Sequence, residues 1–237
     1  MALISPSLSV AADQTASQQP GYVALYDQGK LEEAAKELDG ACVGKTNDDT
    51  CRIWKCLLDL EKAAILKERG EGGYDKIAFD NYLILKSILL RNGDNPDYWL
   101  AAAKSFALNN SQSRAKKAIE KALHYRKDFP EARFIRIELG EESDASAAYN
   151  EFKTLAESKG TPPFLSAKTY VRLAGIDYRK YQRNLNANTL DSAETLLRKN
   201  AALKKDVAAL LEKAIAVAPG SAYRNIAEER IGKLGAN

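Results

Sequence analysis

The sequence is poor in the residues that most often serve in catalysis and metal binding. It contains one histidine, His124, and three cysteines in 237 residues. A histidine-rich metal site is therefore excluded, and a Ser-His-Asp triad could use only that histidine. His124 stands near the end of a predicted helix, where the helix dipole favours a cation. We interpret it as a surface or capping residue and expect no metal and no cofactor.

Long apolar runs and a strong charge imbalance are also absent. The apolar runs are short, for example residues 99–103, so no segment is long enough to span a bilayer. The net charge is +3, from 35 basic and 32 acidic residues. Basic and acidic residues alternate, as in Glu32-Glu33 followed by Lys36, which is typical of a solvated helix surface. We therefore expect no nucleic-acid partner, since such proteins concentrate positive charge on one face.

The N-terminal segment, residues 1–20, shows no helical or strand periodicity. Residues 1–12 are apolar enough to resemble the end of a secretory signal, and Val10-Ala11-Ala12 offers small residues for a cleavage point. No Lys or Arg precedes them, so the segment is not a complete signal peptide. We expect residues 1–20 to be a disordered tail or the remnant of a secretion signal. This favours a periplasmic or secreted protein over a cytoplasmic one.

The three cysteines lie close together in the sequence, at Cys42, Cys51 and Cys56. Cys51 and Cys56 are five residues apart on a predicted helix, a rise of about 7.5 Å, which is too far for a bridge. Cys42 and Cys51 flank the turn formed by residues 43–50, so their Cα atoms are able to approach. Two interpretations stay open. Either Cys42 and Cys51 form a disulfide in an oxidising compartment, or all three thiols are reduced with Cys56 in the core.

Apolar residues recur at helical spacing almost everywhere after residue 20. Trp99, Ala102, Ala103 and Phe106 follow the spacing i, i+3, i+4 and i+7. Strand-like alternation over five or more residues is absent. The chain is therefore predicted to be all-α. Further stripes of this kind are Leu31, Ala34, Ala35, Leu38 and Ala41, then Ala115, Ala118, Ile119, Ala122 and Leu123, then Val207, Leu210, Leu211, Ala214 and Ile215.

The helices come in pairs, with particular residue types at fixed places. Gly29 stands where a turn joins two helices, and Ala34 is the small residue at their closest approach. Trp99 opens a later copy, in which Ala115 takes the place of Ala34. Small residues let two helix backbones approach, and neighbouring pairs then stack to bury their apolar faces. Over about residues 20–235 the chain resembles the tetratricopeptide repeat (TPR) family.

This resemblance implies a right-handed superhelical solenoid of antiparallel helix pairs, occupying residues 21–237 as about five pairs and a C-terminal capping helix at 222–234. The interval from Ala115 to Ala148 is close to the family period of about 34 residues. The interval from Ala34 to Ala115 is longer than two such periods. We assign this excess to a divergent pair with helices near residues 50–69 and 75–91.

A second interval that does not match a whole number of TPR periods lies nearer the C-terminus. The interval from Ala148 to Val207 is longer than one period but shorter than two. Residues 183–206 therefore either lengthen the last pair or form an additional helix. A helical array with looser periods, such as HEAT repeats, or an unrelated bundle is the rival architecture.

The TPR resemblance implies a non-catalytic scaffold that holds a peptide or helix of another protein in a concave groove. A basic groove favours an acidic segment or a C-terminal carboxylate. The chaperone-docking members of the family also use asparagines along the groove, which have no match here. The rival interpretation is that the basic residues are only solvated surface. The groove candidates are Lys104, Arg133, Arg172, Arg179 and Lys180.

Two other functions remain as alternatives. A cell-envelope assembly or accessory factor of the same fold is favoured by the signal-like start and by the Cys42/Cys51 pair. A thiol-dependent enzyme would use Cys51, because a helix N-terminus lowers the pKa of a thiol. No partnered histidine supports that chemistry, and residues 70–73 lack the Lys-Ser/Thr of a phosphate-binding loop. We therefore expect no enzymatic activity.

Overall fold

The computed structural model describes residues 19–45, 47–141, 144–186 and 193–235, so residues 1–18 of the expected tail lie outside these ranges. Within them the chain is all-α, as predicted, with eleven α-helices, one short 3-10 helix and no strand. None of the described helices has the length and apolar character needed to cross a bilayer. The helices are α1 (Gly21–Asp27), α2 (Leu31–Ala41), α3 (Asp49–Arg69), α4 (Tyr74–Ile88), η1 (Leu89–Arg91), α5 (Pro96–Leu108), α6 (Gln112–Tyr125), α7 (Pro130–Gly140), α8 (Ala145–Glu157), α9 (Pro163–Asn186), α10 (Ala193–Val217) and α11 (Ala222–Gly235).

Local sequence signals set the helix boundaries. The Asp48 carboxylate accepts the backbone N–H groups of Thr50 and Cys51 at the start of α3. Asn95 and Asp144 cap α5 and α8 in the same way. Gly70 ends α3 with a left-handed backbone, φ 74°. The helices predicted near residues 50–69 and 75–91 are therefore found as α3 and as α4 continued by η1.

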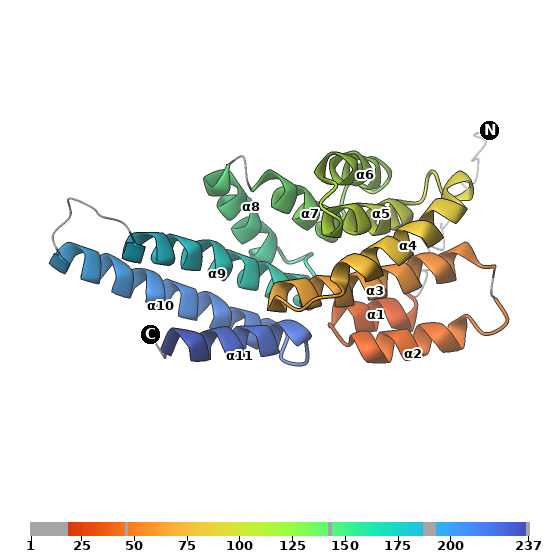
Figure 1. Ribbon diagram of the computed structural model, residues 1–237. Helices are drawn as coiled ribbons and strands as arrows, with labels where there is room; N and C mark the ends of the chain where they lie inside the picture. Colours follow the sequence, from red (N-terminus) through yellow and green to blue (C-terminus); the bar gives the residue numbers. More distant parts are fainter. Residues whose placement is uncertain (1–18, 46, 142–143, 187–192, 236–237) are drawn as a thin grey trace, which may run out of the picture.

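Successive helices pack against each other along the chain (Figure 1). The small residues Ala34 and Ala115 are fully buried, and Ala148 is 4% exposed. The last pair, α9 and α10, contains 24 and 25 residues and extends beyond the rest of the molecule on the left of Figure 1. The excess length in this region thus lengthens the pair: residues 183–186 belong to α9 and residues 193–206 to α10, while Leu190 lies outside the described residues.

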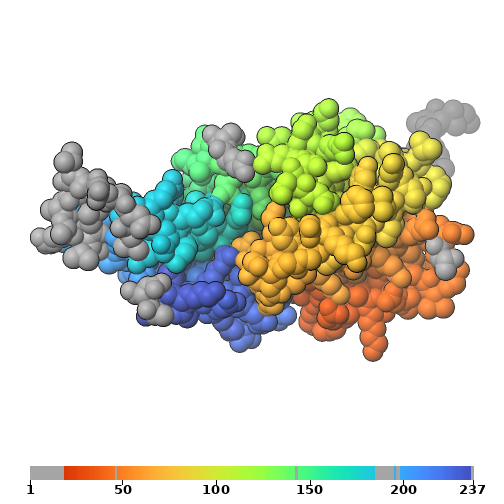
Figure 2. Space-filling model, viewed as in Figure 1, coloured from red at the N-terminus to blue at the C-terminus, as the bar shows by residue number. Residues whose placement is uncertain are grey.

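The two ends of the helical array also contact each other. Helix α1 packs on α9, and α11 packs on α3. In Figure 2 the gold atoms near the end of α3 lie next to the blue atoms of α11. Gly29, at φ 79°, turns from α1 to α2 so close to this junction that an added Cβ would lie 2.5 Å from Phe164 and 2.7 Å from Ser221. Only glycine suits this position. In a simple solenoid each repeat contacts only its neighbours, so this contact between the two ends departs from that pattern.

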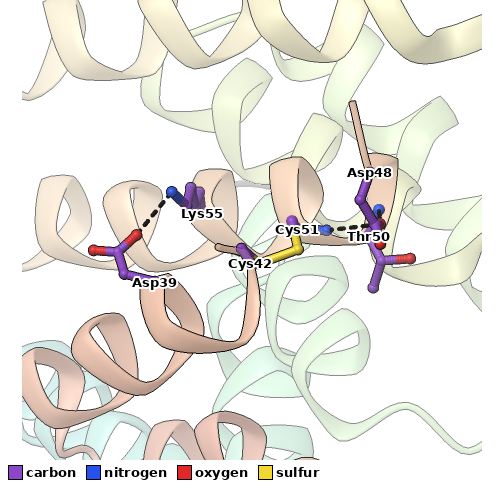
Figure 3. Close-up of a disulfide and its surroundings, with 6 residues drawn as sticks. All are labelled: Asp39, Cys42, Asp48, Thr50, Cys51 and Lys55. Atoms are coloured by element: carbon purple, nitrogen blue, oxygen red, sulfur yellow. Dashed lines mark hydrogen bonds and ion pairs between the residues drawn. A yellow bond between two sulfur atoms is a disulfide. The ribbon is translucent and has the colours of Figure 1, made fainter. Parts of the chain in front are cut away.

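A disulfide joins the end of α2 to the first turn of α3 (Figure 3). The Cys42 and Cys51 sulfur atoms are 2.05 Å apart and the Cα atoms 6.0 Å apart. Of the two interpretations open from the sequence, the structure has the bridge, and it leaves Cys51 no free thiol. Cys56 is free and buried, and that burial raises the pKa of its thiol to about 12. Beside the bridge, Lys55 and Asp39 form an ion pair of 2.7 Å.

The buried alanines generate the first prediction. Replacing Ala34 or Ala115 by leucine overpacks a helix contact and should lower the free energy of unfolding by about 1–3 kcal/mol. Denaturant unfolding followed by circular dichroism measures this change. The control is Ala147→Leu at an exposed position of α8, which should shift stability by less than about 0.5 kcal/mol. Equal effects at buried and exposed positions would contradict the packing argument.

The second prediction concerns the disulfide between Cys42 and Cys51. Cys42 and Cys51 are nine residues apart, so the chain-entropy estimate for losing the bridge is about 2.5 kcal/mol. The double variant Cys42→Ser/Cys51→Ser should lose about this much stability, and added reductant should not change it further. Intact mass with and without reductant should differ by two hydrogen atoms in the parent protein, because the reductant supplies two electrons and two protons are taken up. An unchanged mass would show that the bridge does not form.

Candidate binding groove

The carboxylate of Glu61 lies in the interior of the molecule. Its side chain is 0% exposed, which for a charged residue requires close partners. Every odd-numbered helix contributes one side chain to the surrounding network, although these helices are spread from one end of the described chain to the other. The members, from α1, α3, α5, α7, α9 and α11 in order, are Tyr26, Glu61, Lys104, Glu131, Lys168 and Tyr223.

Both oxygens of Glu61 accept two hydrogen bonds. Oε1 accepts from Lys168 Nζ at 2.8 Å and from the Tyr223 hydroxyl at 3.1 Å. Oε2 accepts from Lys104 Nζ at 2.7 Å and from Lys168 Nζ at 2.9 Å. The Tyr26 hydroxyl also lies 3.4 Å from Oε2 but donates its one proton to Glu131 at 2.6 Å, so the four bonds above occupy the four acceptor sites of an ionised carboxylate. The buried charge is therefore fully satisfied by side chains that come from three other helices.

Lys104 connects this carboxylate to a second one. Its Nζ donates to the Tyr26 hydroxyl at 2.7 Å and pairs with Glu131 as well as Glu61. The Tyr26 hydroxyl in turn donates to Glu131 Oε1 at 2.6 Å. All three N–H groups of the lysine are thus used. The network contains two lysines and two glutamates and is neutral overall.

The electrostatics favour these charged forms. Burial alone would raise the pKa of Glu61, but the charges and hydrogen bonds of Lys104 and Lys168 outweigh it and lower this pKa to about 2. Burial opposes the charge of Lys104 too, yet Glu131 and Glu61 leave its pKa raised. Burial, together with the neighbouring glutamates, raises the pKa of both Tyr26 and Tyr223 well above the usual value, so both hydroxyls remain donors.

Beside this network the helices enclose a groove with two adjoining hollows. The first, of about 370 Å³, is reached by Lys104, Lys168 and Tyr223 of the network and has apolar walls that include Leu60 and Phe134. The second, of about 310 Å³, lies among α3, α9, α10 and α11. Glu68 and Arg172 line both hollows, so we describe them together as the groove.

Basic side chains predominate in the groove. Its lining contains eight basic and three acidic residues, and its floor includes Val207, Leu211 and Ile226. Three of its arginines are held by buried or half-buried glutamates: Arg172 Nε donates to Glu141 at 2.8 Å, Arg179 pairs with the same carboxylate, and Arg230 pairs with Glu68 at 2.6 Å. The basic residues are Lys67, Arg69, Lys104, Lys168, Arg172, Arg179, Arg230 and Lys233.

The structure places three of the five groove candidates in this lining. Arg172 and Arg179 share the carboxylate of Glu141, and Lys104 is 5% exposed and bound into the Glu61 network. Arg133 is instead exposed and pairs with Asp128 at 3.5 Å. Lys180 pairs with Asp177 at 3.0 Å and lies over the ring of Tyr149. Neither Arg133 nor Lys180 lines the groove.

Sequence reasoning did not select Glu61, although a local signal was present. Glu61 lies four residues after Leu57 and four before Ile65, and both of these are buried on the core side of α3. A charged residue in the middle of an apolar stripe indicates a buried ion pair. Lys67, Lys168 and Arg230 carried no comparable signal. His124, interpreted as a surface residue, is exposed in the last turn of α6.

Comparison of the chain with protein-family models and with curated proteins finds no match. The function must therefore be argued from the geometry and charge of the groove.

The Glu61 network generates the third prediction. Glu61→Gln leaves the Lys168 ammonium without its counter-charge and leaves Lys104 with Glu131 alone, so the free energy of unfolding at pH 7 should fall by about 3–5 kcal/mol. Because the folded-state pKa is lowered from 4.5 to about 2, the stabilisation is present above pH 4.5 and is lost as the pH falls from 4.5 towards 2. The variant should lack this part of the acid dependence. Urea unfolding across that pH range measures it.

The matched control is Glu32→Gln, because Glu32 is 85% exposed in its ion pair with Lys62. Such pairs contribute at most about 1 kcal/mol. Glu61→Gln would contradict the role of the network if its stability and acid dependence equalled those of this control.

Proposed function

We propose that this protein is a non-catalytic scaffold that holds a segment of another protein in its groove. One observation carries the proposal: the groove combines an apolar floor with eight basic and three acidic side chains. Apolar contact with the groove walls would contribute to the binding energy, while the cations would set the orientation and the association rate. The segment is acidic or ends in a free carboxylate, since both form charge-assisted hydrogen bonds with arginine.

The proposed architecture behind this function is a TPR-like right-handed superhelix. Five successive helix pairs followed by a single terminal helix support it, as do the small buried residues at Ala34, Ala115 and Ala148. In this architecture the odd-numbered helices form most of the inner surface. Because the Glu61 network joins all the odd-numbered helices, the groove is formed before the partner binds, which lowers the entropic cost of binding.

A second candidate is a cell-envelope accessory factor with the same fold and groove, acting in the periplasm. The disulfide between Cys42 and Cys51 supports it, since such bridges persist in oxidising compartments and are rare in the cytosol. The two candidates differ in location, not in mechanism. The two candidates can be distinguished by extracting the protein under acid quench and alkylating its free thiols. In a protein from an oxidising compartment only Cys56 should be alkylated, whereas in one from a reducing compartment all three cysteines should be.

The groove generates the fourth prediction. Arg172→Glu/Arg179→Glu reverses two groove charges and should weaken binding of a labelled peptide that alternates glutamate and leucine by about tenfold or more. Fluorescence anisotropy measures the affinity, and circular dichroism checks that the variant is folded. The same peptide with an amidated C-terminus shows whether the terminal carboxylate or the acidic side chains are recognised.

The chain offers its own control in Arg133→Glu/Lys180→Glu, which reverses two basic residues outside the groove. Binding to this control should remain within about twofold of the parent, because charges at a distance are screened by salt. Equal loss of affinity in both double variants would show that only the net charge matters, and the groove assignment would be wrong.

A further inference from the structure

A third hollow, separate from the groove, adjoins the Tyr26 and Glu131 side of the Glu61 network. It has a volume of about 200 Å³ and lies among α1, the first half of α3, the start of α5 and the segments that lead into α7 and α9. Four aromatic rings contribute to its walls, and we call it the aromatic pocket. The rings are Tyr26, Trp54, Phe129 and Phe164.

The charge of this pocket is opposite to that of the groove. Asp27, Asp97, Asp128 and Glu131 line it together with a single basic residue, Arg126. Three of these carboxylates already have a cation. Asp97 pairs with Arg126 at 3.0 Å, Asp128 with Arg133 at 3.5 Å, and Glu131 with Lys104.

Asp27 is the exception among the four. Within the described chain its side-chain partner is a neutral group, the Gln19 amide, which donates to Oδ2 at 3.1 Å. Burial raises the pKa of the Asp27 carboxyl, and the nearby charge of Glu131 acts in the same direction against the opposing hydrogen bond from Gln19. The pocket therefore contains one half-buried negative charge without a counter-charge from the described residues. One positive charge would compensate it.

The aromatic walls indicate what kind of cation fits. The guanidinium of Arg126 already lies over the ring of Phe129, 4.3 Å from its centroid, so cation–π contact occurs at this site. Among the described residues no basic group lies over the half-buried ring of Trp54, which forms a T-shaped pair with Tyr26, whereas Phe164 is only 2% exposed. Aromatic rings attract cations through their quadrupole and favour methylated ammonium groups, which have no N–H that needs an acceptor.

We propose that the aromatic pocket binds a small methylated ammonium compound, with its cationic head against the half-buried ring of Trp54 and its charge balanced by Asp27. At about 30 Å³ per heavy atom, the volume of a water in the liquid, the pocket holds roughly seven heavy atoms. Choline has this size. The site is independent of the proposed peptide groove, because the two cavities share no lining residue.

The test uses choline and 3,3-dimethyl-1-butanol, which have nearly the same shape and differ in charge. Trp54 and Trp99 are the two tryptophans of the chain, so in a Trp99→Phe background the fluorescence reports on the pocket alone. Choline should change this fluorescence saturably, with a dissociation constant on the order of 1 mM, and the neutral alcohol should bind at least about tenfold more weakly. No saturable change with choline, or equal binding of the alcohol, would overturn the proposal.

Two variants test whether the carboxylate of Asp27 is the charge that choline binding requires. Asp27→Asn should weaken choline binding at least about tenfold, since it removes the uncompensated carboxylate while keeping nearly the same shape. Asp94→Asn, the same substitution at an exposed position outside the pocket, should leave binding unchanged. Calorimetry in the parent chain checks the affinity without the Trp99 substitution. If Asp27→Asn binds choline as well as Asp94→Asn does, the assignment to this pocket is wrong.

Discussion

The burial of one carboxylate constrains the whole arrangement of helices. An ionised glutamate without solvent is stable only when charged partners surround it, since its desolvation costs several kcal/mol. Glu61 meets this requirement with two lysines and a tyrosine, and the network reaches Tyr26 and Glu131 through Lys104. These side chains come from all six odd-numbered helices. A shift of any one helix pair would leave a buried charge or donor unpaired, so the network specifies how the pairs stack.

This network also changes how stability is distributed. In a simple helical solenoid, stability is a sum of contacts between neighbouring repeats. Here Glu61 and Tyr223 are 162 residues apart in sequence and share a hydrogen bond, and Gly29 fits closely against Phe164 and Ser221. Such long-range contacts couple the first pair to the last helix. The disulfide acts on a different scale, because it closes only nine residues between α2 and α3.

The same side chains separate two surfaces of opposite character. Lys104, Lys168 and Tyr223 reach the basic groove, while Tyr26 and Glu131 reach the aromatic pocket with its carboxylates. A neutral network between them lets each surface keep its own charge without an unpaired ion in the interior. Both cavities are lined mainly by helices, which preserves their geometry for a ligand.

Sequence alone determined the features that depend on neighbouring residues. Apolar spacing identified the helices, and it could do so because the packing pattern of a helix repeats within one or two turns. The sequence did not settle whether a disulfide forms, since it shows that Cys42 and Cys51 are able to approach but not that they do. The partners of Glu61, the position of Arg179 in the groove while the adjacent Lys180 lies outside it, and the contact between the ends of the array are visible only in the folded chain. These outcomes depend on side chains 35 to 162 residues away and on small rotations of each helix about its axis, which local spacing does not encode.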